Sequence, residues 1–175
     1  MTPLAVLRCA ALIALGLVLQ YCIVDGIRIA GAHPDLMILL PIAGGYVAGP
    51  ERGAGFGFAV GIATDLLLPT TFGLSALVGC LLGFGVGVAT AGLERSSWVL
   101  PPVIFAVATA AGLAAYAILG AVLGEPLLVT AALPAALVVC VPTAVILAVP
   151  VLRAVAWALP VPASSEGSRT GGGVR

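Results

Sequence analysis

Long apolar segments follow one another along most of the chain, separated by short stretches of charged residues, prolines and glycines. A helix needs about 20 predominantly apolar residues to cross the hydrocarbon core of a bilayer. Measured against that length, the polar breaks predict six membrane-spanning helices. The predicted segments cover residues 4–24, 34–49, 53–69, 72–92, 98–123 and 127–152.

The second and third segments are shorter than a full crossing. Sixteen helical residues at a rise of 1.5 Å extend over about 24 Å, whereas the hydrocarbon core is about 30 Å thick. These helices could continue beyond the breaks, lie in a locally thinned bilayer, or form a partly buried hairpin. A five-helix alternative treats this region as one crossing and an interfacial piece, so both counts remain open.

Composition places the chain outside the range of soluble proteins. Hydrophobic residues make up 62% of its 175 positions and charged residues 8%, whereas about a quarter of the residues in a soluble domain are charged. The sequence therefore predicts an all-α integral membrane protein. Seven arginines balance seven acidic residues, and lysine is absent, which gives no basis for a nucleic-acid partner.

The four cysteines lie scattered through the apolar segments, without the close spacing that metal and redox sites use. We therefore expect no metal ion or cofactor and interpret the cysteines as small buried apolar residues. They are Cys9, Cys22, Cys80 and Cys140.

The arginines predict the orientation of the chain in the membrane, because cytoplasmic loops retain positive charge. With six crossings, one side carries six arginines and the other carries only Arg28. This distribution favours an even number of crossings and places both termini in the cytoplasm. We expect a membrane domain over residues 1–159, followed by a disordered cytoplasmic tail at 160–175, "PVPASSEGSRTGGGVR". The six arginines are Arg8, Arg52, Arg95, Arg153, Arg169 and Arg175.

Glycines recur every fourth residue in the third and fourth predicted helices. Rows of small residues at this spacing allow helix backbones to approach closely in lipid. We therefore expect these two helices to pack tightly, against each other or against a partner, although the chain has 23 glycines and could produce such rows by composition alone. The two rows are Gly53, Gly57 and Gly61, and Gly79, Gly83 and Gly87.

Asp65 follows Gly61 by four residues and continues the same helix face. A carboxylate close to the hydrocarbon is costly unless a partner satisfies it. It could fix the end of the helix, contribute to a binding interface, or serve transport or proton relay. No second carboxylate or lysine lies in the interior of the predicted spans, which weakens the transport interpretation. Candidate partners are Thr64, Thr70, Thr71, Ser75 and the backbone amides that begin the fourth helix.

The order of these elements resembles the MreD family of the bacterial rod-shape and cell-elongation system. The resemblance is carried by residues 33–77, "HPDLMILLPIAGGYVAGPERGAGFGFAVGIATDLLLPTTFGLSAL". Within this stretch, Pro34 and Asp35 open an apolar helix, and "GPERGA" forms a short turn. Gly61 and Asp65 end the glycine-rich third helix, and "FGLSAL", which contains Gly73, begins the fourth.

This resemblance implies a non-enzymatic scaffold of the bacterial cytoplasmic membrane that binds MreC. Together with MreB, RodA and a class B penicillin-binding transpeptidase, it would help to control cell shape and side-wall peptidoglycan synthesis among membrane lipids. The implied fold is a six-helix bundle similar to the substrate-binding subunit of energy-coupling-factor transporters. The candidate helix-packing or partner-binding residues are Pro34, Asp35, Gly53, Gly57, Gly61, Asp65, Gly73, Gly79, Gly83 and Gly87.

Two alternatives to the scaffold remain, a small-molecule transporter and an enzyme. A small-molecule transporter, or its substrate-binding subunit, needs several converging polar groups in an apolar pocket. The candidates beyond Asp65 are few: Gln20, Tyr21, Tyr46, Tyr116 and some threonines. An enzyme could use His33 in the first outer loop, but a solvated histidine before a helix-opening proline is the simpler interpretation.

Overall fold

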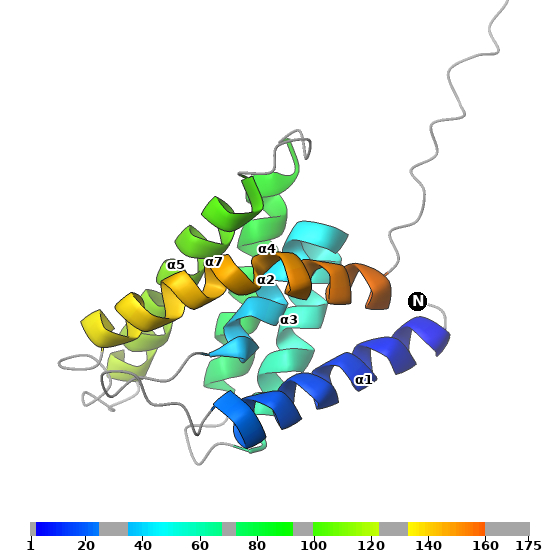
Figure 1. The fold of residues 1–175 in the computed structure, drawn as a ribbon, viewed down its shortest axis with the longest axis horizontal. Coiled ribbons are helices and arrows are strands. Elements are labelled where there is room, and N and C mark those ends of the chain that lie inside the picture. The colour runs from blue at the N-terminus through cyan, green and yellow to red at the C-terminus, as the bar shows by residue number, and fades with distance from the viewer. Residues whose placement is uncertain (1–2, 25–34, 68–72, 93–99, 123–132, 160–175) are drawn as a thin grey trace, which may run out of the picture.

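The computed structural model describes residues 3–24, 35–67, 73–92, 100–122 and 133–159, and all regular structure within these ranges is helical (Figure 1). The prediction of an all-α fold is thereby confirmed, and each predicted segment overlaps one of the described α-helices. The described helices are α1 (Pro3–Leu19), continued by the π-helical turn η1 (Gln20–Val24), α2 (Leu36–Ala48), α3 (Pro50–Asp65), α4 (Leu74–Thr90), α5 (Leu100–Val122) and α7 (Leu133–Ala158).

Three of the described helical stretches are long and apolar enough to cross a membrane. They are Pro3–Cys22, Leu100–Val122 and Ala136–Ala158. Helix α2 is apolar but has only 13 residues, which corresponds to a length of about 20 Å. Helices α3 and α4 have 16 and 17 residues. The short second and third segments of the sequence are therefore two separate short helices.

The last helix ends later than the sequence indicated. The sequence predicts a span that ends at residue 152, before Arg153, but α7 continues to Ala158. Val155 and Ala158 are fully buried and keep the final turns packed on the protein. The side chain of Arg153 is exposed, so a long charged residue is accommodated within the helix by extending away from it.

The turn between α2 and α3 is shorter than the predicted "GPERGA" segment. Gly49 alone separates the two helices, with φ of 82°, a value that favours glycine. Pro50 is the first residue of α3, where its fixed φ and missing N–H suit a helix start. Glu51 and Arg52 therefore belong to the first turn of α3, which ends at Asp65 rather than at residue 69.

Helix α2 lies at the centre of the bundle and packs against α3, α4, α5 and α7. The most extensive pairing joins α3 to α4, and α5 pairs with α7. Helix α1 lies along the outside and contacts mainly α7 (Figure 1). Consistent with this arrangement, Leu39, Ile42 and Ala43 of α2 are almost completely buried.

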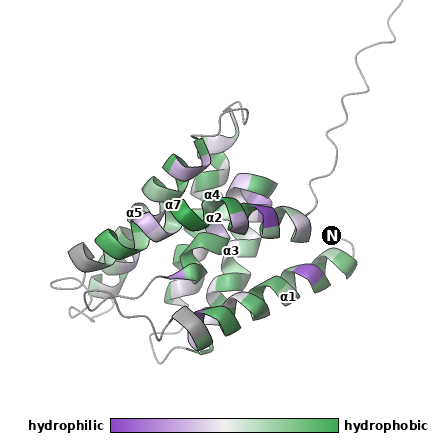
Figure 2. Ribbon diagram, in the orientation of Figure 1, coloured by the Kyte–Doolittle hydropathy of each residue, from purple (hydrophilic) through white to green (hydrophobic). Residues whose placement is uncertain are grey.

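Large apolar side chains cover the outer surface of the bundle. Figure 2 shows hydrophobic residues along the outward-lying helices, including α1 and α5. Leu7, Val122 and Ile146 are each more than 60% exposed. Contiguous apolar surface on this scale is unusual for a soluble monomer and fits helices surrounded by lipid acyl chains. The fold and the length of the apolar helices indicate a membrane protein.

Candidate functional site

The two glycine rows lie against each other in the antiparallel pair of α3 and α4. A Cβ atom added to Gly57 would overlap the backbone oxygen of Gly79, and one added to Gly79 would overlap that of Gly57. Gly53 and Gly83 face each other in the same reciprocal way. The backbones therefore touch directly, which brings more atoms into van der Waals contact than longer side chains would allow.

Helix α2 joins this contact through Gly45, a residue outside the two predicted glycine rows. A Cβ on Gly45 would overlap the backbone oxygen of Gly83, and one on Gly53 would meet the Cα of Gly45 at 2.5 Å. Pro41 fills the space beside Gly57 and Gly79. Gly45 lies four residues before Gly49. This spacing of small residues is the sequence feature that could have indicated the role of Gly45 in helix packing.

The ends of the rows lie at the two helix junctions. Gly87 faces Gly49 and Pro50, where α2 turns into α3. Gly61 faces the backbone of Ser75 and Ala76, where α4 begins. The glycine rows therefore run the whole length of the α3 and α4 pair.

Asp65 is the last residue of α3 and lies beside the start of α4. Its carboxylate is 4% exposed and accepts hydrogen bonds from the backbone N–H groups of Gly73 at 2.9 Å and of Ser75 and Ala76 at 3.2 Å each. The first N–H groups of a helix have no partner within the helix and carry its positive partial charge. The carboxylate therefore caps α4 from the end of α3.

Of the partners considered for Asp65, the structure shows the backbone amides at the start of the fourth helix. The hydroxyl of Thr64 donates instead to the carbonyl of Val60 at 2.9 Å. Thr70 and Thr71 lie outside the described residues. Gly73 has φ of 99°, a conformation that glycine adopts without strain and that turns its N–H toward Asp65.

A second carboxylate begins α2. Asp35 is the N-cap residue, and its side chain accepts a hydrogen bond from the N–H of Met37 at 2.8 Å. Gln20, which the sequence suggested as a candidate ligand-binding group, accepts a hydrogen bond from the N–H of Leu36 at 2.9 Å through Oε1. Gln20 thus ties the end of α1 to the start of α2. Pro34 lies outside the described residues.

Replacing Asp35 with alanine should destabilise the protein by about 1 kcal/mol, the usual cost of losing an N-cap side chain. Thermal unfolding in detergent measures this loss. Asp35→Asn is the matched control, because its side-chain oxygen can still accept the hydrogen bond from Met37. An alanine variant as stable as the parent would contradict a capping role.

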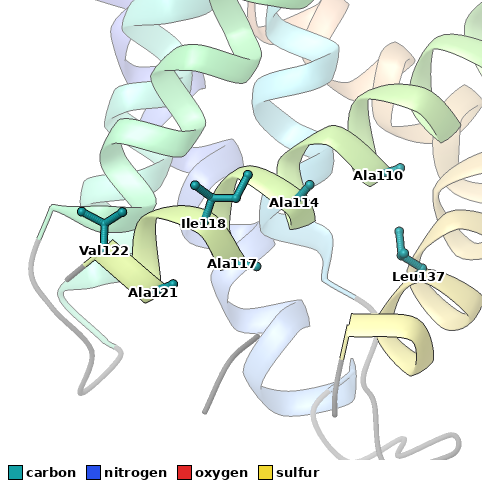
Figure 3. Close-up of a pocket in the computed structure, with 7 residues that line it drawn as sticks. All are labelled: Ala110, Ala114, Ala117, Ile118, Ala121, Val122 and Leu137. Carbon is teal, nitrogen blue, oxygen red and sulfur yellow. The ribbon is translucent and has the colours of Figure 1, made fainter. Parts of the chain in front are cut away.

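A cavity of about 420 Å³ opens on the surface of the bundle where α5 faces the beginning of α7 (Figure 3). Its lining is apolar, and a small-molecule site usually adds a few converging polar groups to such a surface. The cavity therefore gives no support to the transporter alternative. Its lining residues are Ala110, Ala114, Ala117, Ile118, Ala121, Val122 and Leu137.

Comparison with known families gives a match to one of them. Residues 2–125 match the family described as rod shape-determining protein MreD. No curated protein and no solved structure matches the chain significantly. The matched range includes both glycine rows, Asp35 and Asp65, and extends well beyond the residues that carry the resemblance in the sequence. The chain therefore belongs to the MreD family, whose members are shape-determining membrane proteins.

Proposed function

We propose that the protein is a non-enzymatic scaffold of the bacterial cell-elongation machinery that binds MreC. In this role it helps to direct side-wall peptidoglycan synthesis together with MreB, RodA and a class B penicillin-binding transpeptidase. The observation that carries the proposal is the family match over residues 2–125, because this family takes part in determining rod shape.

The packing of the bundle supports a scaffold. Helices α2, α3 and α4 meet through backbone contacts at Gly45, Gly53 and Gly83, and such contacts cannot rearrange without separating the helices. Helices α1, α5 and α7 surround this centre with exposed apolar side chains. A rigid centre with apolar outer helices suits a protein that presents a fixed surface to the transmembrane helix of a partner.

We further propose that all six predicted helices cross the membrane, with both termini in the cytoplasm. Arg8 and Arg52 lie in the first two turns of α1 and α3, and Arg153 lies in the last two turns of α7. Six crossings of alternating direction would bring these three arginines to the same side of the membrane. The positive-inside rule would place this side in the cytoplasm. A reporter fused after Arg175 that is active only in the cytoplasm tests the orientation, and an exterior position would refute it.

Capture of MreC from native membranes tests the scaffold. The full-length protein is tagged, expressed in a rod-shaped bacterium and extracted in a mild detergent. We expect MreC to co-purify with it, and not with an unrelated polytopic protein that carries the same tag at the same level. Failure to retain MreC, while the extracted protein is monodisperse and unfolds cooperatively, would contradict the proposal.

A further inference from the structure

Two arginines flank a tryptophan at the end of the bundle where α1 begins and α7 ends. The guanidinium of Arg8 lies over the indole ring of Trp157, 5.0 Å from the ring centroid. Arg153 precedes Trp157 by four residues on α7, so their side chains project from the same side of that helix. Arg153 and Trp157 are both exposed. The three side chains therefore form one surface cluster that bridges α1 and α7.

Arg8 and Trp157 lie close to helix ends, where a membrane-spanning helix reaches the lipid head groups. Arg8 is in the second turn of α1, and Trp157 is next to the last residue of α7. Leu4 and Leu7 are more than half exposed beside Arg8 and present apolar surface to acyl chains. Tryptophan is enriched at this boundary because its ring has an apolar face and a polar N–H. Arginine reaches the head groups by extending its aliphatic stem.

The described carboxylates occupy other positions. Asp35 is hydrogen-bonded to a backbone N–H at the start of α2, and Asp65 to one at the start of α4, whereas Glu51 lies in the first turn of α3. Lipid phosphate is the abundant anion at the depth of the cluster. A guanidinium presents paired N–H donors that match the geometry of a phosphate, and stacking on an indole ring adds a cation–π attraction that holds it in place.

We propose that Arg8, Arg153 and Trp157 bind the phosphate of an anionic phospholipid in the surrounding leaflet. The lipid joins α1 to α7 at a point where few polar contacts link the two helices among the residues that the structure describes. Arg8 stacks on Trp157, and Cys9 Sγ donates a weak hydrogen bond to the carbonyl of Ala158 at 3.8 Å. The bound phosphate therefore holds α1, which lies along the outside of the bundle, against α7.

Titration of the purified full-length protein with phosphatidylglycerol in neutral-detergent micelles, read by native mass spectrometry, tests the proposal. We expect phosphatidylglycerol to bind more tightly than phosphatidylcholine. Arg8→Gln and Arg153→Gln should each weaken its binding about fivefold, the effect of removing one arginine near an anionic membrane surface. The matched control is Arg52→Gln, because Arg52 is also an exposed arginine near a helix end but lies on α3. This control should retain the parental affinity.

Three results would overturn the proposal. Equal affinity for phosphatidylcholine would show that the phospholipid need not be anionic, and an equal loss in Arg52→Gln would show diffuse attraction without a site. Displacement of the lipid by inorganic phosphate at matched ionic strength would assign the cluster to free phosphate. Thermal unfolding in lipid-free detergent checks the folding of each variant. If Arg8→Gln is unstable, the exposed Arg153→Gln decides the outcome.

Discussion

Replacing Gly57 with valine is expected to destabilise the protein by at least about 3 kcal/mol. The added Cβ would overlap the backbone oxygen of Gly79 and approach Pro41 to 3.1 Å, so α3 and α4 would have to move apart. Overpacking by a few carbon atoms typically costs 1–3 kcal/mol, and here the obstructing atoms include backbone that cannot rotate away. Thermal unfolding in detergent should show a midpoint lower by about 10 °C.

Gly55→Val is the matched control, because Gly55 is on the same helix and nothing lies within 4 Å of its added Cβ. Both variants place a β-branched residue in α3, so the change in helix propensity is the same. We expect the control to unfold close to the parent. Equal loss in both variants would mean that propensity, rather than close packing of the two backbones, makes glycine necessary at position 57.

Asp65→Leu is expected to destabilise the protein by about 3–5 kcal/mol. The substitution leaves the N–H groups of Gly73, Ser75 and Ala76 without their acceptor. Each hydrogen bond to a charged group contributes about 1.5–3 kcal/mol. We expect a lower midpoint of thermal unfolding and faster amide hydrogen exchange at the start of α4, with little change at the far end of the bundle.

Two controls separate the cap from other roles of the carboxylate. Asp65→Asn keeps one accepting oxygen and should retain part of the lost stability, whereas Glu51→Gln changes an exposed carboxylate on the same helix and should be neutral. If Asp65→Leu unfolds like the parent but captures less MreC, the carboxylate serves the partner and does not cap α4. If both properties are unchanged, Asp65 has neither role.

Much of the fold follows from local features of the sequence. The apolar segments predicted all-helical structure in a membrane protein because backbone groups in lipid must be satisfied within each segment. The limits of α5 lie within two residues of the predicted segment 98–123. The predicted helix boundaries were wrong where the same local residues are compatible with two different structures. A charge does not end a helix when its side chain can extend away, as at Arg153, and a proline followed by Glu51 and Arg52 can begin a helix instead of forming a turn.

Residue spacing alone predicted that glycines line one face of the third and fourth helices and that Asp65 lies on the same face as the glycines of the third, because helical periodicity is a local property. The groups that this face contacts became known from the packing of the helices. This packing paired Gly57 with Gly79, added Gly45 from α2, and placed the start of α4 beside the carboxylate. These partners depend on how antiparallel helices align in space, and the spacing of residues along one helix carries no information about the alignment of two.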